Sequence, residues 1–142
     1  MLRRVISSAS LRREANDMKR WIGRWIIGVG IIHTAFGFVV FREPLSAMLR
    51  DGVWNAVDGH PGRPLAFWFV FVGLLTIVFG HLVDWTEGRG LLLPRFVAWG
   101  FFVLVILGIV TMPVGGGWLL LPAGLGLVVR SYRGRTSAGP AV

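Results

Sequence analysis

Four long apolar segments dominate the chain and are separated by polar connections. They run from Trp21 to Phe41, from Leu65 to Asp84, from Leu91 to Met112 and from Gly115 to Arg130. Apolar positions are nearly continuous in each segment rather than alternating, which favours helices over barrel strands. Because about 20 helical residues cross the hydrocarbon core, the pattern predicts an all-α, antiparallel four-helix transmembrane bundle.

The fourth segment is the shortest, and Pro122 interrupts it. We expect it to thin the bilayer locally or to be shielded by its neighbours. The membrane domain then covers residues 21–130, between two tails, 1–20 and 131–142, that we expect to be disordered and cytoplasmic. Met18 is an alternative start, because the first apolar segment follows it directly.

The composition agrees with a lipid environment. Hydrophobic residues make up 54% of the chain and charged residues only 15%. A soluble domain of this size buries too little surface to hide so many apolar side chains. The chain has no cysteine, which excludes disulfides, thiolate metal sites and cysteine nucleophiles.

The distribution of the cations predicts the topology. The formal net charge is +8, but the cations lie in tails and connections rather than in a stripe interleaved with aromatic residues, so nucleic-acid binding is not expected. Twelve Lys and Arg residues fall on one side of the four segments and three, Arg42, Arg50 and Arg63, on the other. The excess places both termini in the cytoplasm of a bacterial cell, as a multi-pass inner-membrane protein.

Two further features concern the surface and the packing of the bundle. Pro44 and Gly52 bracket an apolar stripe in the connection from Arg42 to Pro64, which predicts a short interfacial helix in this outer loop. Glycine and threonine recur on one face of each segment, including Gly30, Thr34 and Gly37. Such small residues allow helices to approach closely in lipid.

His33 is the main candidate for a functional residue, because an ionisable group inside a membrane is costly and faces the bundle interior. We expect it to lie with Thr34 below the outer loop, where Trp54, Asn55 and Trp118 would complete a ligand site. The alternative is structural: a neutral histidine bonded to Thr34, to Thr111 or to a backbone carbonyl.

His81 and Asp84 form a second polar pair, three residues apart. The pair suits either a proton relay or a local hydrogen-bonded cap. It cannot share a metal with His33, because the two histidines differ in depth by more than about 10 Å while ligands sit about 2.1 Å from a metal. We therefore expect no metal site, no cofactor and no catalytic residue set.

Several short motifs resemble an uncharacterised family of small bacterial four-span membrane proteins that carry a domain of unknown function. They are Gly30-x-x-His33-x-x-Phe36-Gly37, Ala66-Phe67-Trp68-Phe69, Asp84-Trp85, Leu93-Pro94 and Pro113 followed by Trp118. The resemblance covers Trp21 to Arg130; it implies an integral membrane bundle and supplies no activity. In size and topology the chain is also distantly similar to DoxX-like proteins.

Three functions remain open at this point. The first is a non-enzymatic membrane protein that holds a lipid-like or quinone-like molecule, or a partner subunit, in its outer-leaflet half. The second is a membrane oxidoreductase subunit or a small lipid-modifying enzyme that uses His33 or the His81–Asp84 pair for acid–base chemistry. The third is a structural homo-oligomer packed through exposed glycine stripes.

Overall fold

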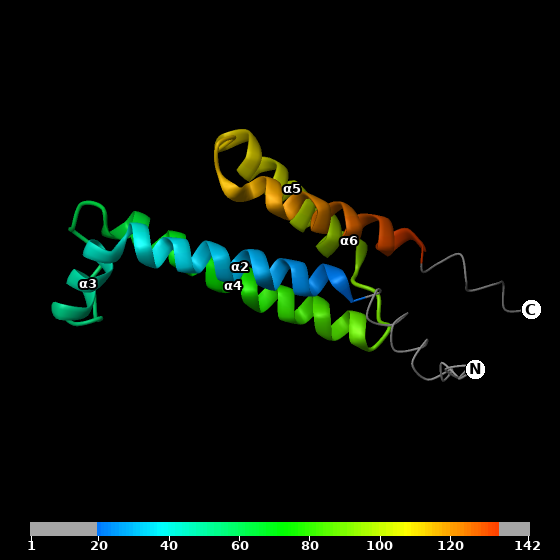
Figure 1. Cartoon of the computed structure of the whole chain (residues 1–142), viewed down its shortest axis with the longest axis horizontal. Helices are drawn as coiled ribbons and strands as arrows, with labels where there is room; N and C mark the ends of the chain where they lie inside the picture. Colours follow the sequence, from blue (N-terminus) through cyan, green and yellow to red (C-terminus); the bar gives the residue numbers. More distant parts are fainter. Residues whose placement is uncertain (1–19, 134–142) are drawn as a thin grey trace, which may run out of the picture.

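A computed structural model describes residues 20–133, so residues 1–19 and 134–142 of the two predicted tails lie outside the described residues. Residues 131–133, which are predicted to belong to the second disordered tail, are helical. The described part is helical and contains no strand. Figure 1 shows a long antiparallel pair of helices beside a shorter helical hairpin, with one small helix turned across the far end of the long pair. The elements are α2 (Trp21–Val40), α3 (Arg42–Arg50), α4 (Arg63–Gly88), α5 (Arg95–Thr111), the 3-10 helix η1 (Gly116–Leu120) and α6 (Leu121–Arg133).

The long pair, α2 and α4, is held together at glycines that leave no room for a side chain. A methyl group on Gly30 would lie 2.8 Å from the side chain of Ile77, and one on Gly80 would lie 2.8 Å from the backbone nitrogen of Ile27. On Gly23 it would meet the backbone of Asp84. The small-residue interface predicted for these two segments is therefore present.

The hydrophobic core lies at the end of the molecule where α2 begins, which we call the Arg20 end. There the hairpin of α5, η1 and α6 packs on the long pair, and Phe79 of α4 stacks on Phe101 of α5 with ring centroids 4.7 Å apart. The buried core residues are Ile22, Ile26, Val83, Ala98, Ala123 and Leu127. The last of them on α2 is Ile26, so the core supports only the first part of that helix.

The tip of the hairpin contacts α2 near its beginning. The indole Nε1 of Trp25 donates a hydrogen bond to the carbonyl oxygen of Leu119 at 2.6 Å, and Trp118 Nε1 donates to the carbonyl of Pro113 at 2.9 Å. The two indoles thus provide hydrogen-bond donors to carbonyl groups of the hairpin tip, where the backbone is not regular α-helix. Beyond the tip, the second half of α2 and the first half of α4 extend towards α3 without the hairpin beside them (Figure 1).

The helix boundaries differ from the predicted segments where proline and glycine intervene. The third helix begins at Arg95 rather than Leu91, because Pro94 serves as its N-cap. The fourth predicted segment is divided into η1 and α6, with Pro122 in the first turn of α6, and α6 continues to Arg133. The connection for which an interfacial helix is predicted does contain a short helix, α3, which begins at Arg42, before Pro44. Its position at a membrane interface stays a prediction.

Two helices, α2 and α4, are long and apolar enough to cross a membrane, and α5 is a shorter apolar helix. At 1.5 Å per residue, the 20 residues of α2 span about 30 Å and the 17 of α5 about 26 Å. The hairpin is therefore the shorter half of the molecule, rather than two further helices of equal length.

Candidate functional site

His33 lies in the second half of α2, where α4 is its neighbour. Its Nε2–H donates a hydrogen bond to the backbone carbonyl of Phe69 at 3.1 Å, because a carbonyl oxygen can only accept. The imidazole also stacks on the Phe69 ring, with centroids 4.0 Å apart and planes 10° from parallel. The contact with a backbone carbonyl is the one that the structural alternative for His33 predicted.

The hydrogen bond leaves one nitrogen of the imidazole available. With the proton on Nε2, the neutral ring carries a lone pair on Nδ1, and this atom has no hydrogen-bond partner among the described residues. The side chain is only partly buried. His33 can therefore tie α2 to α4 and still accept a hydrogen bond from a further group.

Thr34 supports the same contact from the next position of α2. Its hydroxyl donates to the carbonyl of Gly30 at 2.8 Å, so its donor is used within its own helix. Opposite, Gly73 of α4 makes room: a methyl group there would meet Thr34 Oγ1 and would lie 3.0 Å from His33 Cδ2. The absence of a side chain at Gly73 thus permits the approach of His33 to Phe69.

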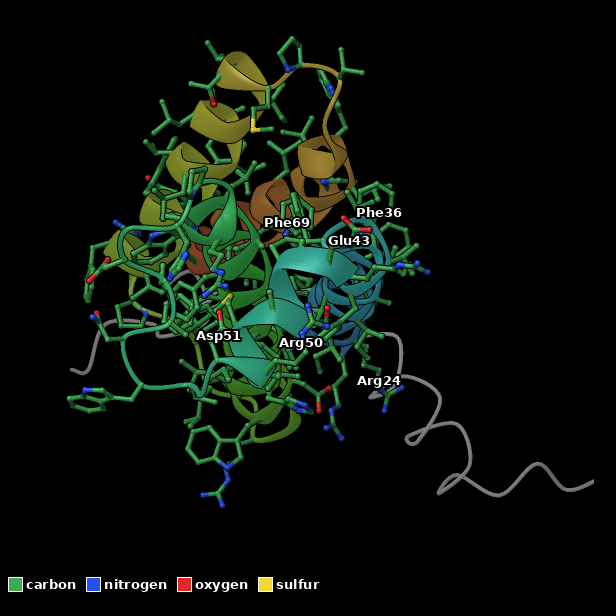
Figure 2. All side chains as sticks on the ribbon, turned by 90° about the vertical axis from the view of Figure 1, so that its left-hand side faces the viewer. Arg24, Phe36, Glu43, Arg50, Asp51 and Phe69 are labelled. Carbon is green, nitrogen blue, oxygen red and sulfur yellow. The ribbon has the colours of Figure 1, made fainter. Side chains whose placement is uncertain are left out.

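The Phe69 ring, which stacks on the imidazole, also contacts two further phenylalanine rings, and we call these three phenylalanines, together with His33, the His33 cluster. Phe69 stands 6.2 Å from Phe36 and 5.2 Å from Phe41, measured between ring centroids. Figure 2 shows Phe36 and Phe69 on the side of the long pair that faces α5 and α6. Phe36 is 58% exposed and the nearby Ile32 63% exposed, because the hairpin does not extend this far along α2.

The remaining predicted ligand residues lie elsewhere. Trp54 and Asn55 are in the connection after α3; Trp54 is 96% exposed, and Asn55 adopts a left-handed backbone conformation with φ 53°. Trp118 is at the hairpin tip, where its indole is bonded to Pro113. Among the described residues, His33 and Thr34 are therefore brought together, whereas Trp54, Asn55 and Trp118 make no hydrogen bond or ring contact with His33.

Asp84 of the second polar pair faces arginines rather than His81. Arg20 Nη2 donates to Asp84 Oδ2 at 2.6 Å, and Arg24 Nε lies 3.7 Å from the other carboxylate oxygen. His81 is exposed, although it lies one turn away on the same helix. The carboxylate thus links the start of α2 to the end of α4. The choice between a proton relay and a cap for the His81–Asp84 pair stays a prediction.

Glu87, one turn further along α4, is the most enclosed acidic side chain of this region, with 2% of its side chain exposed. It accepts a hydrogen bond from the backbone N–H of Gly23 at 2.9 Å and another from Arg130 Nη1 at 2.5 Å. A carboxylate at a helix N-terminus is favourable because free N–H groups and the helix dipole point towards it. One side chain thus holds α2, α4 and α6 together at the Arg20 end.

A second ion pair organises the opposite end. Arg63, at the start of α4 and 8% exposed, donates to Asp51 Oδ2 at 2.5 Å and to the carbonyl of Ala56 at 2.8 Å. The hydrogen bond and the charge of Arg63 lower the pKa of the Asp51 carboxyl from its ordinary value. The carboxylate is thus ionised at neutral pH and fixes the connection between α3 and α4.

Within residues 20–133, no group of three or more His, Asp or Glu side chains is arranged to hold a metal ion. In a comparison with known families, a model described as a family of unknown function, DUF6463, matches residues 17–134 of the chain. The chain belongs to this family. No curated protein and no solved structure matches the chain.

The DUF6463 match includes every helix within residues 20–133 and therefore the His33 cluster and both ion-pair regions. Sequence reasoning did not single out Phe69, Glu87 or Arg63 as partners. Phe69 contributes a backbone carbonyl, which no side-chain pattern reveals. Glu87 and Arg63 could have been noticed as charges at the two ends of one apolar segment, but their partners lie 7 to 64 residues away in the chain.

Proposed function

We propose that this member of the family is a four-helix integral membrane protein that binds a lipid-like or quinone-like molecule beside the His33 cluster. In this proposal α2 and α4 cross the bilayer, and the α5–α6 hairpin enters it from the Arg20 end. The observation that carries the proposal is the uncovered face of α2 around His33, where an imidazole nitrogen stands among partly exposed phenylalanines.

The geometry favours a ligand that donates a hydrogen bond. The proton on Nε2 is used by the Phe69 carbonyl, so Nδ1 is an acceptor and suits a hydroxyl, such as that of a quinol or of a lipid glycerol. The rings of Phe36 and Phe69 would contact the apolar part of the molecule. Trp118 would lie below it at the hairpin tip, and Trp54 has no part in the site.

The first test is mass spectrometry of lipophiles extracted from the protein purified in mild detergent. His33→Gln keeps an amide that can donate to the Phe69 carbonyl but lacks the Nδ1 acceptor. We expect the wild-type protein to hold one lipophile per chain, and His33→Gln to lose it with little change in melting temperature. His81→Gln, an exposed histidine on α4, is the matched control and should retain the ligand.

Two results would contradict the proposal. If His33→Gln retains the ligand, Nδ1 does not bind it. If the wild-type protein carries only bulk lipid, the uncovered face has no small-molecule ligand, and a partner subunit becomes the better explanation for it. A bound chromophore, or turnover of an added lipid, would instead support the enzymatic alternative.

A homo-oligomer is a second candidate, favoured by glycines that the chain does not use for its own packing. Methyl groups on Gly28, Gly100 or Gly108 would meet no atom within 4 Å, unlike those on Gly30 or Gly73. Gly100 and Gly108 lie on α5, where a second copy could approach closely. Cross-linking in native membranes tests this, and only monomers would count against it.

A further inference from the structure

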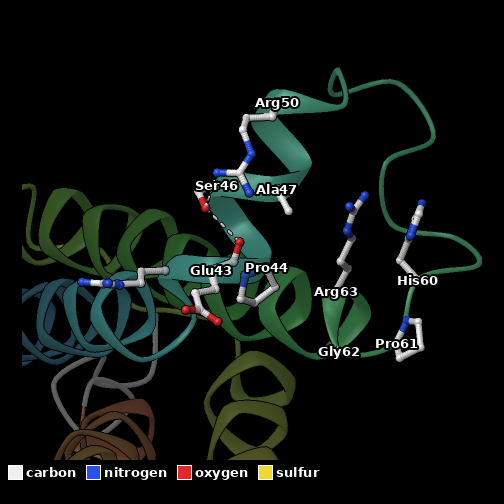
Figure 3. A pocket seen from close by; sticks show the side chains of 10 residues that line it. Glu43, Pro44, Ser46, Ala47, Arg50, His60, Pro61, Gly62 and Arg63 are labelled. Carbon is white, nitrogen blue, oxygen red and sulfur yellow. Dashed lines mark hydrogen bonds between the residues drawn. The ribbon is translucent and has the colours of Figure 1, made fainter.

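A hollow at the α3 end of the molecule is lined by charged side chains that have no part in the proposed function. It has a volume of about 990 Å³ and lies between α3 and the start of α4. In Figure 3, Arg50 folds back towards Ser46 on α3, while Arg63 and His60 stand side by side across the hollow. Arg42 and Glu43 also line it.

The arginines of the hollow are not equivalent. Arg63 is occupied, because Asp51 and the Ala56 carbonyl accept its hydrogen bonds. Arg50 makes one long hydrogen bond, 3.3 Å to Ser46 Oγ, and most of its five N–H donors stay available. Arg42 has no hydrogen bond or ion pair among the described residues. The residues that line the hollow thus include these two arginines and one carboxylate residue, Glu43.

Exposed apolar side chains lie directly beside these charges. Leu49 on α3 is 73% exposed, and Val53 and Trp54 in the following connection are 76% and 96% exposed. A short amphipathic helix with arginines on one side and apolar residues on the other is typical of a membrane interface. Apolar side chains then enter the lipid, while arginines stay at the depth of the phosphates.

We propose that the hollow binds the phosphate of an anionic phospholipid in the leaflet at the α3 end. Arg50 and Arg42 donate to the phosphate oxygens, because the planar guanidinium fork matches their geometry, and His60 provides a further donor. The excess of free guanidinium groups over carboxylates favours an anionic headgroup over a zwitterionic one. This inference rests on the membrane placement proposed above but not on a ligand at His33.

The test uses the absence of cysteine from the chain, which makes an introduced cysteine unique. Ala47→Cys lines the hollow, and Leu49→Cys, two residues away on α3, lies outside it. Each full-length variant carries a benzophenone on its cysteine, is reconstituted in phosphatidylcholine vesicles with a minor share of phosphatidylglycerol, and is irradiated. Mass spectrometry then identifies the cross-linked lipids.

We expect phosphatidylglycerol to be enriched at position 47 by about fivefold over its share in the vesicle, as two exposed charge contacts would give. At position 49 the adducts should follow the bulk composition. In the Ala47→Cys background, the double variant Arg42→Gln/Arg50→Gln should remove the enrichment. Glu43→Gln, which removes the opposing charge without touching the arginines, should increase it.

Bulk proportions at position 47, or an enrichment that the arginine and glutamate variants leave unchanged, would overturn the proposal. If millimolar glycerol phosphate abolishes the enrichment, the hollow binds a soluble phosphate ester, which overturns the assignment to a lipid. If Leu49→Cys gives no lipid adduct at all, the proposed membrane placement is wrong. This outcome distinguishes a failure of the membrane placement from a failure of phosphate binding in the hollow.

Discussion

At the scale of single residues, Glu87 is the clearest determinant of stability. Its carboxylate accepts hydrogen bonds from the start of α2 and from Arg130 of α6 while it is itself part of α4. No other side chain in the described residues is seen to join three helices in this way. The residue makes these contacts through charge and position, and it needs no catalytic or ligand-binding role to explain its burial.

Glu87→Ala is expected to destabilise the protein by about 3 kcal/mol, because it leaves the Gly23 N–H without its acceptor and removes the ion pair between Glu87 and Arg130. Unfolding in detergent, followed by circular dichroism, measures the change. Glu43→Ala is the control: it removes an exposed carboxylate at the other end and should stay within about 0.5 kcal/mol of the wild type. Equal losses of stability in the two variants would show that the buried Glu87 carboxylate contributes no more to stability than the exposed Glu43 carboxylate does.

At the scale of elements, the packing of α2 on α4 depends on which glycines face the partner helix. The sequence places Gly28 and Gly30 two residues apart on α2, yet only Gly30 lies against α4. Gly73 of α4 is the contact on which the His33 cluster depends. Gly28 and Gly73 therefore form a matched pair of helical glycines, one open and one enclosed.

Gly73→Ala is expected to cost about 1–3 kcal/mol, because the added methyl group would overlap Thr34 Oγ1 and force the helices apart. Gly28→Ala meets open space, and alanine favours a helix over glycine, so this variant should be neutral or slightly stabilising. The melting temperatures of the two variants, measured in the same detergent, test this difference in stability. A Gly73→Ala protein as stable as Gly28→Ala would contradict the close interface.

The hairpin of α5, η1 and α6 leads to a second prediction at this scale. Its tip has no charged residue, Val114 there is fully exposed, and two indoles satisfy tip carbonyls, as irregular backbone in hydrocarbon requires. A maleimide that cannot cross membranes should therefore react slowly with Val114→Cys from either side, and rapidly once the protein is denatured. Rapid reaction in the native membrane would place the tip in water.

Sequence patterns predicted the helical class, α3 and the small-residue contact of the long pair, because each depends on residues close together in the chain. They did not predict the unequal lengths of the two pairs. Pro94 and Pro122 shorten the third and fourth helices, and proline in an apolar segment permits either a kink or an end. The hydrophobic core lies at the Arg20 end because the shorter hairpin packs on only that part of the long pair. The hydrophobicity of the four segments alone does not predict this position.

The candidate site was predictable only in part for a similar reason. The position of His33 within an apolar segment was enough to single it out, and the pattern left open whether it binds a ligand or a carbonyl. The structure shows the bond to the Phe69 carbonyl, with Nδ1 still available. The sequence predicts Trp54 and Asn55 above His33, because they follow it in the connection after the first apolar segment, but in the structure Trp54 is exposed and does not contact His33.

At the scale of the whole molecule, the two ends differ in chemistry. The Arg20 end carries Arg20, Arg24 and Arg130 around a pair of carboxylates, and Arg89 and Arg95 flank the turn between α4 and α5. The α3 end carries an amphipathic helix and the hollow. An excess of arginine on the cytoplasmic side is the common arrangement in membrane proteins, so we infer that the Arg20 end is cytoplasmic and the α3 end is external.

The most direct test of this account is the accessibility of single cysteines at the two ends. Val53→Cys reports on the α3 end, and Arg89→Cys reports on the Arg20 end. In spheroplasts treated with a maleimide that cannot cross membranes, we predict that Val53→Cys is labelled at once and that Arg89→Cys is labelled only after lysis. Labelling of both before lysis, or recovery of the protein outside the membrane fraction, would contradict the account.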